Sequence, residues 1–380
     1  MSEIVLTKPK QRDSNLELFR IITMFLIVAH HYVVNSGLTG VGGPIYSDPL
    51  SLRSLFLLLL GAWGKIGINC FVLISGYFMC KSNITAKKFV KLLGEVVFYR
   101  ILIYVIFWVS GYEPFTLMGF VQAILPFMTV AHNFTGTYLL FFLCIPFLNV
   151  LVNHMNERQH IRLLLLSLFI YVFFGTLPLF SVTMNYVSWY IVLYFIASYI
   201  RLYPKKLFEN TRFWGLMTLL CVLLSAASVV GCAFVGMKLG RQMAYWLVTD
   251  SNTFLAVLTG VCSFLFFKNL KLKYSPIINA ISATTFGVLL IHAHSATMRK
   301  WLWVDILDNV GTYGSAWMPL HAIGSVIVIF AVCSVIDMCR IRLIEAPCLK
   351  LWDKWFEKIA PKWTAFENKL CDKLNIGGKS

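Results

Sequence analysis

Arg20 and His31 lie in the first long apolar segment of the chain, residues 16–35, at a spacing that could support chemistry. Eleven residues at ~100° each make roughly three helical turns, so both side chains fall on one helix face, about 16 Å apart along the axis. An arginine offers paired donors to a phosphate or carboxylate, and a neutral histidine can take a proton from a hydroxyl. The pair could therefore bind an anion and move a proton.

The same segment carries two further polar side chains. Glu17 lies one turn before Arg20 and can pair with it, and His30 lies about 80° away from the shared face. Polar groups at membrane depth are costly unless they face a protein interior, a cavity or a partner. We therefore expect a helix whose stripe of Glu17, Arg20 and His31 points into a bundle.

Structural interpretations of these residues stand beside the chemical one. His31 could be a structural histidine that bonds a neighbouring helix. Arg20 could extend to the membrane surface while Glu17 holds it. His30 could pack, or it could fix the tautomer of His31.

Composition indicates the environment that these residues occupy. Of the 380 residues, 58% are hydrophobic and 13% charged, and the mean hydropathy is +0.74. A soluble domain carries about twice that charged fraction. We therefore predict an all-α, polytopic integral membrane protein surrounded by lipid. The ten cysteines are scattered without a CxxC pair, which predicts neither a metal site nor a disulfide framework.

About ten segments are long and apolar enough to be considered as transmembrane helices. The second carries Gly61, Lys65 and Gly67, which suggests a half-helix followed by a span from about Ile68. Pro126 interrupts the apolar stretch 114–130, for which we expect a re-entrant or interfacial piece. The ten segments are residues 16–35, 54–79, 89–110, 136–154, 162–180, 183–201, 213–237, 252–268, 276–297 and 316–339.

The basic residues predict the orientation of these helices. With the N-terminus inside, most Lys and Arg fall on the inner side, as cytoplasmic topology signals do. The net charge of +16 is thus spread between apolar segments and indicates no nucleic-acid partner. Both termini should be cytoplasmic, which requires an even number of spans. We divide the chain into a cytoplasmic segment (1–15), a transmembrane domain (16–345) and a basic amphipathic tail on the inner leaflet (346–380).

Five stretches, in order, resemble the membrane-bound acyltransferase 3 family. The first is "NLELFRIITMFLIVAHHYVV", with Arg20 and His31, and the second is "INCFVLISGYFM", with Ser75, Gly76 and Tyr77. The others are "YLLFFLCIPFLNVLV", "SWYIVLYFIASYIRLYP" and "INAISATTFGVLLIHAHS". The resemblance covers nearly the whole chain. Members are bacterial proteins that O-acylate cell-envelope sugars, so it implies a multi-pass protein of the bacterial cytoplasmic membrane.

The resemblance also implies a reaction. The donor would be acyl-CoA, usually acetyl-CoA, acting as a substrate with no bound cofactor. The acceptor would be a hydroxyl of an exopolysaccharide, capsular or other envelope glycan. His31 would act as the base, and Arg20 would orient the donor or the histidine. A covalent acyl-histidine is an open alternative.

The expected donor site departs from the family. Many members have an R-x-x-R pair where the third helix leaves the cytoplasm, whereas this chain has Lys87, Lys88 and Lys91, with Gly94 where the second arginine would fall. We therefore assign donor binding to these lysines and to Arg100. Glu95 and Arg100 could instead form a buried pair.

The remaining candidates line the expected substrate pocket. They are His30, Glu17, Ser75, Tyr77, Glu95 and His292. For Ser75 and Gly76 the structural alternative is close helix packing, since small residues let helices approach. An alternative function for the whole chain is a transporter or flippase for a glycan or small anion. The sequence shows no internal repeat, which argues against such a carrier.

Overall fold

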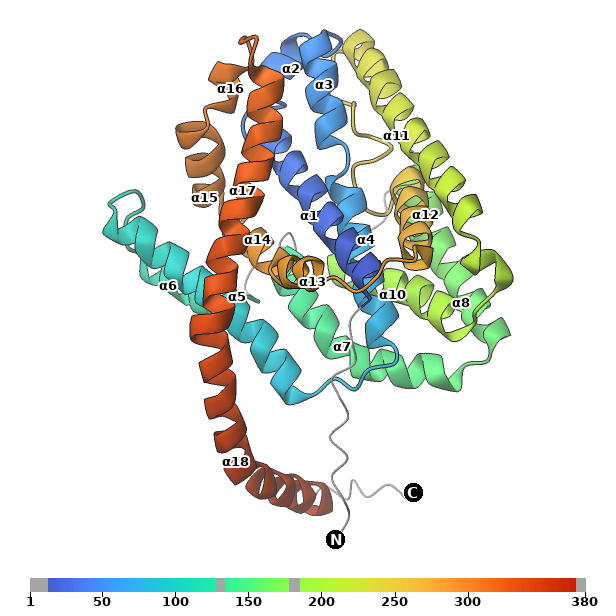
Figure 1. Ribbon diagram of the computed structural model, residues 1–380, viewed down its shortest axis with the longest axis vertical. Helices are drawn as coiled ribbons and strands as arrows, with labels where there is room; N and C mark the ends of the chain where they lie inside the picture. The colour runs from blue at the N-terminus through green and yellow to red at the C-terminus, as the bar shows by residue number, and fades with distance from the viewer. Residues whose placement is uncertain (1–12, 128–133, 178–184, 374–380) are drawn as a thin grey trace.

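The structure, a computed structural model, describes residues 13–127, 134–177 and 185–373. These residues form helices and no strand. Figure 1 shows long helices gathered around α1, with α11 along one edge and the C-terminal helix leaving the body.

Helix α1 (Ser14–Val34) is the centre of the bundle. Six helices pack against it: α3 (Leu52–Gly61), α4 (Gly64–Met79), α12 (Phe254–Asn269), α13 (Pro276–Ala283), α14 (Thr285–His292) and α17 (Met318–Arg340). Its polar residues consequently face protein, as the cost of exposing them to lipid requires.

The second predicted segment is broken, as its glycines suggest. The break lies at Ala62 and Trp63, between α3 and α4, rather than near Ile68. Gly64 is the first residue of α4 and lies against α1, since a Cβ on Gly64 would lie 2.2 Å from Cγ of His30. A Cβ on Gly76 would lie 3.1 Å from Cβ of Ala197, which shows close packing between α4 and α10.

Two further groups of helices flank this centre. In the first, α10 packs against α4, α7 and α8; in the second, α11 packs against α12. Side-chain oxygens of Thr85, Thr116, Asn156, Asn185 and Asn210 cap the N-termini of α5, α6, α8, α10 and α11. The bounds are α2 (Pro44–Ser47), α5 (Ala86–Val109), α6 (Leu117–Ile124), α7 (Phe134–His154), α8 (Glu157–Leu168), η1 (Phe169–Phe173), α9 (Phe174–Thr176), α10 (Tyr186–Leu202), η2 (Lys206–Glu209) and α11 (Thr211–Leu239).

The ninth predicted segment, 276–297, is part of a bent unit. α13 and α14 run from Pro276 to His292, and the chain then turns by 94° into α15 (Ala296–Lys300), η3 (Trp301–Ile306) and α16 (Asn309–Thr312). The bend places His292 at the end of α14 and Arg299 just beyond it.

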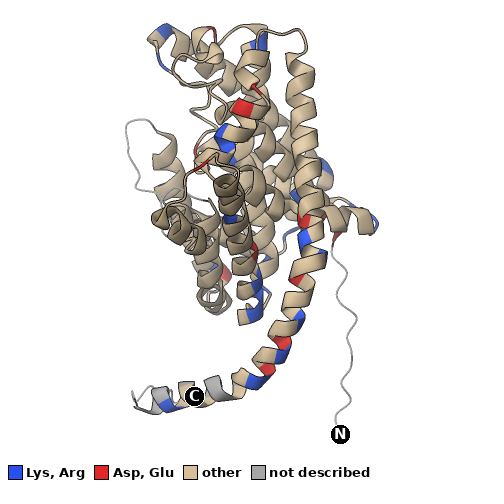
Figure 2. Ribbon diagram, turned by 90° about the vertical axis from the view of Figure 1, so that its left-hand side faces the viewer, with Lys and Arg blue, Asp and Glu red and all other residues tan. Residues whose placement is uncertain are grey.

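The C-terminal part is one long helical stretch that leaves the body. α17 continues through a π-helical turn, η4 (Ile341–Glu345), into α18 (Ala346–Lys373). Figure 2 shows that this last part carries basic and acidic residues in alternation, whereas the upper half of α17 carries neither.

Seven helical stretches in the described residues are long and apolar enough to cross a membrane, or eight if the bent unit counts as one span. Tyr186–Leu202 and Phe254–Asn269 are apolar but shorter, at 17 and 16 residues. Ten spans and cytoplasmic termini therefore stay predictions. Within 114–130 the described part holds only the short helix α6, and residues 128–130 lie outside the description.

Candidate functional site

Arg20 and His31 line two different cavities on the same side of α1. The cavity of Arg20, about 400 Å³, is bounded by α1, α4, α5, α7, α13, α14 and the end of α17; we call it the arginine cavity. The cavity of His31, about 560 Å³, lies farther along α1; we call it the histidine cavity. Both residues thus face the protein interior, Arg20 at the arginine cavity and His31 at the histidine cavity.

The hydrogen bonds of His31 determine which of its nitrogens can accept a proton. Nδ1 of His292 lies 2.6 Å from the carbonyl oxygen of Val288, which can only accept, so this nitrogen carries the proton. Nε2 of the neutral His292 is therefore an acceptor, and Nδ1 of His31, 2.9 Å away, must donate to it. The neutral His31 is left with a lone pair on Nε2. Within the described residues no partner occupies that atom.

His30 has a different role in the structure. Its Nδ1 donates to the carbonyl oxygen of Gly61 at 2.5 Å, and Gly64 lies against its ring. His292, rather than His30, fixes the tautomer of His31. His30 also lines the histidine cavity.

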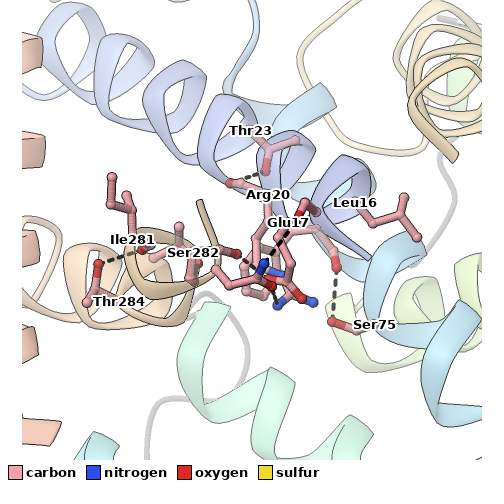
Figure 3. Close-up of polar contacts among 12 residues, drawn as sticks. Leu16, Glu17, Arg20, Thr23, Ser75, Ile281, Ser282 and Thr284 are labelled. Carbon is pink, nitrogen blue, oxygen red and sulfur yellow. Dashed lines mark hydrogen bonds and ion pairs between the residues drawn. The ribbon is translucent and has the colours of Figure 1, made fainter. Parts of the chain in front are cut away.

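Figure 3 shows the surroundings of Arg20. Glu17, which is 3% exposed, lies between Arg20 and Ser282 of α13, and its Oε2 accepts from Nη1 of Arg20 at 3.0 Å and from the Ser282 hydroxyl. The guanidinium lies over the ring of Phe71, 5.8 Å from its centroid. Nε of Arg20 is buried without a hydrogen-bond partner among the described residues, and the side chain lines the arginine cavity.

The predicted donor residues separate into three places. Lys88 and Lys91 line the arginine cavity, where Lys91 pairs with Glu345 at 2.6 Å. Lys87 is exposed and pairs with Asp353 of α18 at 2.7 Å. Arg100 lines the histidine cavity and donates to the carbonyl oxygen of Gln122 at 2.6 Å. The structure therefore does not bring Lys87 or Arg100 together with the other two.

Glu95 belongs to a buried network that sequence reasoning missed. Nη2 of Arg340 lies 3.0 Å from Glu95, and the same guanidinium pairs with Asp337 at 2.6 Å and Glu345 at 2.8 Å. Tyr99, which lines the histidine cavity, donates to Asp337 at 2.8 Å. The charge pattern marks Arg340 only as a topology signal, because it directly follows the apolar segment 316–339 and nothing in the sequence indicates its burial.

Ser75 and Tyr77 take up different positions. The Ser75 hydroxyl donates to the carbonyl oxygen of Phe71 at 3.0 Å and accepts from Tyr138 at 2.9 Å, on the wall of the arginine cavity. Tyr77 accepts from Arg201 of α10 at 2.6 Å and lines neither cavity. Ser75 keeps a candidate pocket position, whereas Tyr77 joins α4 to α10.

A contiguous group of aromatic rings lines parts of both cavities. Phe71, Tyr138 and Phe286 line the arginine cavity, and Phe134 lines the histidine cavity. The ring centroids of neighbouring members are 5.7 to 6.4 Å apart. We call these four residues the aromatic partition.

Lys65 and Arg299 line a cavity, although the sequence analysis named neither as a site residue. Both face the histidine cavity, and Nζ of Lys65 donates to the hydroxyl of Tyr186 at 2.5 Å. The rule applied to Arg20 would have found Lys65, a lone cation inside an apolar segment. A third cavity, about 670 Å³ beside the α11–α12 connection, includes none of the predicted site residues.

Comparison with known proteins identifies the family. A family model described as an acyltransferase domain matches residues 13–338, which include α1, the lining of the histidine cavity and the lining of the arginine cavity up to Phe286. The chain belongs to the acyltransferase 3 family. This membership supports a multi-pass membrane acyltransferase. Neither the curated proteins nor the solved structures contain a match.

Proposed function

We propose that this acyltransferase moves an acyl group, acetyl in the first instance, from acyl-CoA to a hydroxyl of an exopolysaccharide, capsular or other envelope glycan in a bacterial cytoplasmic membrane. The observation that carries the proposal is the lone pair on Nε2 of His31, which opens on a cavity and is fixed by the His292–Val288 chain. A base in a defined tautomer is what the attack of a hydroxyl requires.

The reaction divides between the two cavities. The donor lies in the arginine cavity, where Arg20 and Lys88 offer donors to its phosphates, and its thioester reaches past the aromatic partition. The acceptor hydroxyl lies in the histidine cavity against His31. The approach of the two substrates from opposite ends of α1 keeps the thioester away from bulk water.

His31 transfers the proton in two steps. As the acceptor oxygen attacks the thioester carbon, Nε2 takes the hydroxyl proton; when the C–S bond breaks, the imidazolium returns that proton to the CoA thiolate. The products are an acyl ester and free CoA thiol, with no net proton released. A covalent acyl-His31 would use the same nitrogen as a nucleophile.

A reconstituted assay tests the proposal. Protein in liposomes is given labelled acetyl-CoA and envelope glycan from the host, and we expect label on the glycan as an alkali-labile ester. His31→Ala should abolish the transfer, while His154→Ala, a change at an exposed histidine at the end of α7, should not. Full transfer by a normally inserted His31→Ala would overturn the role of the base.

The alternative of a transporter or flippase gives a different result in this assay. A carrier moves its substrate across the liposome membrane without consuming acetyl-CoA. Solute uptake with no release of CoA, with any acceptor supplied, would therefore replace the acyltransferase proposal.

A further inference from the structure

We propose that the acceptor is anionic: a carboxylate or phosphate of the glycan binds in the histidine cavity to Lys65, Arg100 and Arg299. This inference rests on the proposed function and names the substrate class. The three cations come from α4, α5 and α15 and face one cavity.

The charges around this cavity are unbalanced. Of the described residues that line it, none is Asp or Glu, and none of the three cations pairs with a described carboxylate. The undescribed internal segments 128–133 and 178–184 contain no acidic residue in sequence. All three cations are half-buried, and burial without a counter-charge is costly, which indicates that a ligand supplies the missing negative charge.

The arginine cavity provides an internal comparison. There Arg20 pairs with Glu17, Lys91 with Glu345, and Arg340 with Glu95, Asp337 and Glu345. Of the four described cations that line the arginine cavity, only the exposed Lys88 lacks a carboxylate partner, whereas all three described cations of the histidine cavity lack one. The difference is specific to the histidine cavity, so it is not a general property of this chain's interior.

Several hydrogen-bond donors of the residues that line this cavity have no partner among the described residues. Nε of Arg100 and Nδ2 of Asn35 are buried without partners, and the guanidinium of Arg299 bonds to no described residue. Lys65 uses one of its three N–H groups on Tyr186. The oxygens of a carboxylate or phosphate accept several such bonds, whereas a neutral sugar ring offers mainly hydroxyls.

The reaction itself favours an anionic acceptor. When His31 takes the hydroxyl proton it becomes a fourth positive charge on the cavity. Repulsion among like charges is strong in a site screened from water. A negative group on the acceptor offsets this charge while the imidazolium exists, so a charged glycan stabilises the transition state as well as the bound state.

The first test separates the glycan by charge. Host envelope glycan is divided by anion exchange into neutral and acidic fractions, and part of the acidic fraction is made neutral by carbodiimide–borohydride reduction of carboxylates or by dephosphorylation. We expect labelled acetyl ester on the acidic fraction and at least tenfold less after neutralisation. Equal labelling of neutral glycan would overturn the inference while leaving the proposed function intact.

Kinetics of matched variants identify what the cavity binds. Arg299→Gln should raise KM for the acidic glycan at least tenfold, with KM for acetyl-CoA within twofold, and Arg299→Lys should restore part of the loss. Lys300→Gln removes the same charge one residue away, outside the cavity, and should leave both constants unchanged. A rise in KM for acetyl-CoA alone would show that the cations hold the donor's phosphates and would overturn the inference.

A binding measurement needs no turnover. Thermal unfolding of the purified protein is followed with glucuronate, inorganic phosphate or glucose, because a ligand that binds only the folded state raises the unfolding midpoint. We expect glucuronate or phosphate, but not glucose, to raise it, and Arg299→Gln to remove the rise. No shift with either anion would contradict the inference even if acetyl transfer were never detected.

Discussion

His292 determines, at the scale of single residues, what His31 can do. Because the N–H at Nδ1 of His292 donates to the carbonyl oxygen of Val288, Nε2 of His292 accepts a hydrogen bond from Nδ1 of His31. Nε2 of His31 is then the nitrogen that is open to the cavity. In a catalytic triad a carboxylate orients the histidine base; here a second histidine, itself bonded to a backbone carbonyl, orients His31. His292 is therefore a positioning residue, since it acts through His31.

Removal of this orienting group should slow the chemical step. We expect His292→Ala to lower kcat for acyl transfer by on the order of 10²-fold, within the range that a positioned base contributes, with KM for acetyl-CoA nearly unchanged. Loss of the fixed tautomer should also change the pH profile of kcat, which a purely structural loss would not. An unchanged kcat would contradict the role of His292.

The sequence predicted one half of this site. The phase of Arg20 and His31 follows from helical periodicity alone, so their common face could be read directly. The contact between His31 and His292 joins residues 261 positions apart. Lys88 and Arg100 lie on the same helix, but which cavity each of them lines depends on the helices that pack against α5. Such contacts depend on tertiary packing, which no local pattern encodes.

At the scale of elements, Gly64 sets how closely α4 approaches α1. A Cβ there would overlap the ring of His30, whereas a Cβ on Gly94 of α5 would meet nothing within 4 Å. Close approach of this kind is the usual reason for glycine at a helix contact.

These two glycines form a matched pair for a stability test. Gly64→Ala should lower the free energy of unfolding by about 1–3 kcal/mol because α4 or His30 must shift. Gly94→Ala should leave it unchanged or raise it by about 0.5–1 kcal/mol, since alanine favours a helix. Detergent unfolding titrations measure both. Equal behaviour of the two variants would contradict the contact.

The Arg340 network joins α5 to the end of α17. Arg340→Gln should lower the free energy of unfolding by about 3–5 kcal/mol, because Glu95, Asp337 and Glu345 would then be buried without their cation. Arg342→Gln, at an exposed position in the next turn, should change it by less than about 0.5 kcal/mol. Thermal unfolding of both variants in the same detergent measures the difference, and a mild effect at Arg340 would mean that the network contributes little.

The whole molecule is the scale at which sequence reasoning was least complete. Each of the ten segments predicted from hydropathy contains a helix in the structure. Only seven or eight helical stretches of the described residues, however, are long and apolar enough to cross a membrane. Tyr186–Leu202 and Phe254–Asn269 are largely buried among other helices, so their apolar character reflects the protein core as much as lipid. A one-dimensional pattern cannot separate these two causes.

Fusion proteins test the predicted orientation of the chain. A fluorescent protein fused after Ser380 should fold and fluoresce, because the basic residues predict a cytoplasmic C-terminus. Alkaline phosphatase fused after Lys238, at the end of α11, should be active because that loop is predicted to be external. The reverse pattern in both fusions would contradict the predicted topology.

The aromatic partition has a consequence for the cell as well as for the enzyme. Phe71, Tyr138, Phe286 and Phe134 form a contiguous layer of apolar rings that lines parts of both polar cavities. Ions and protons cross such a layer poorly, because they lose their hydration on entering it. The predicted orientation implies that the cavities open toward opposite sides of the bilayer. An activated carboxylic acid could then pass between two compartments while the electrochemical gradient across the membrane is preserved.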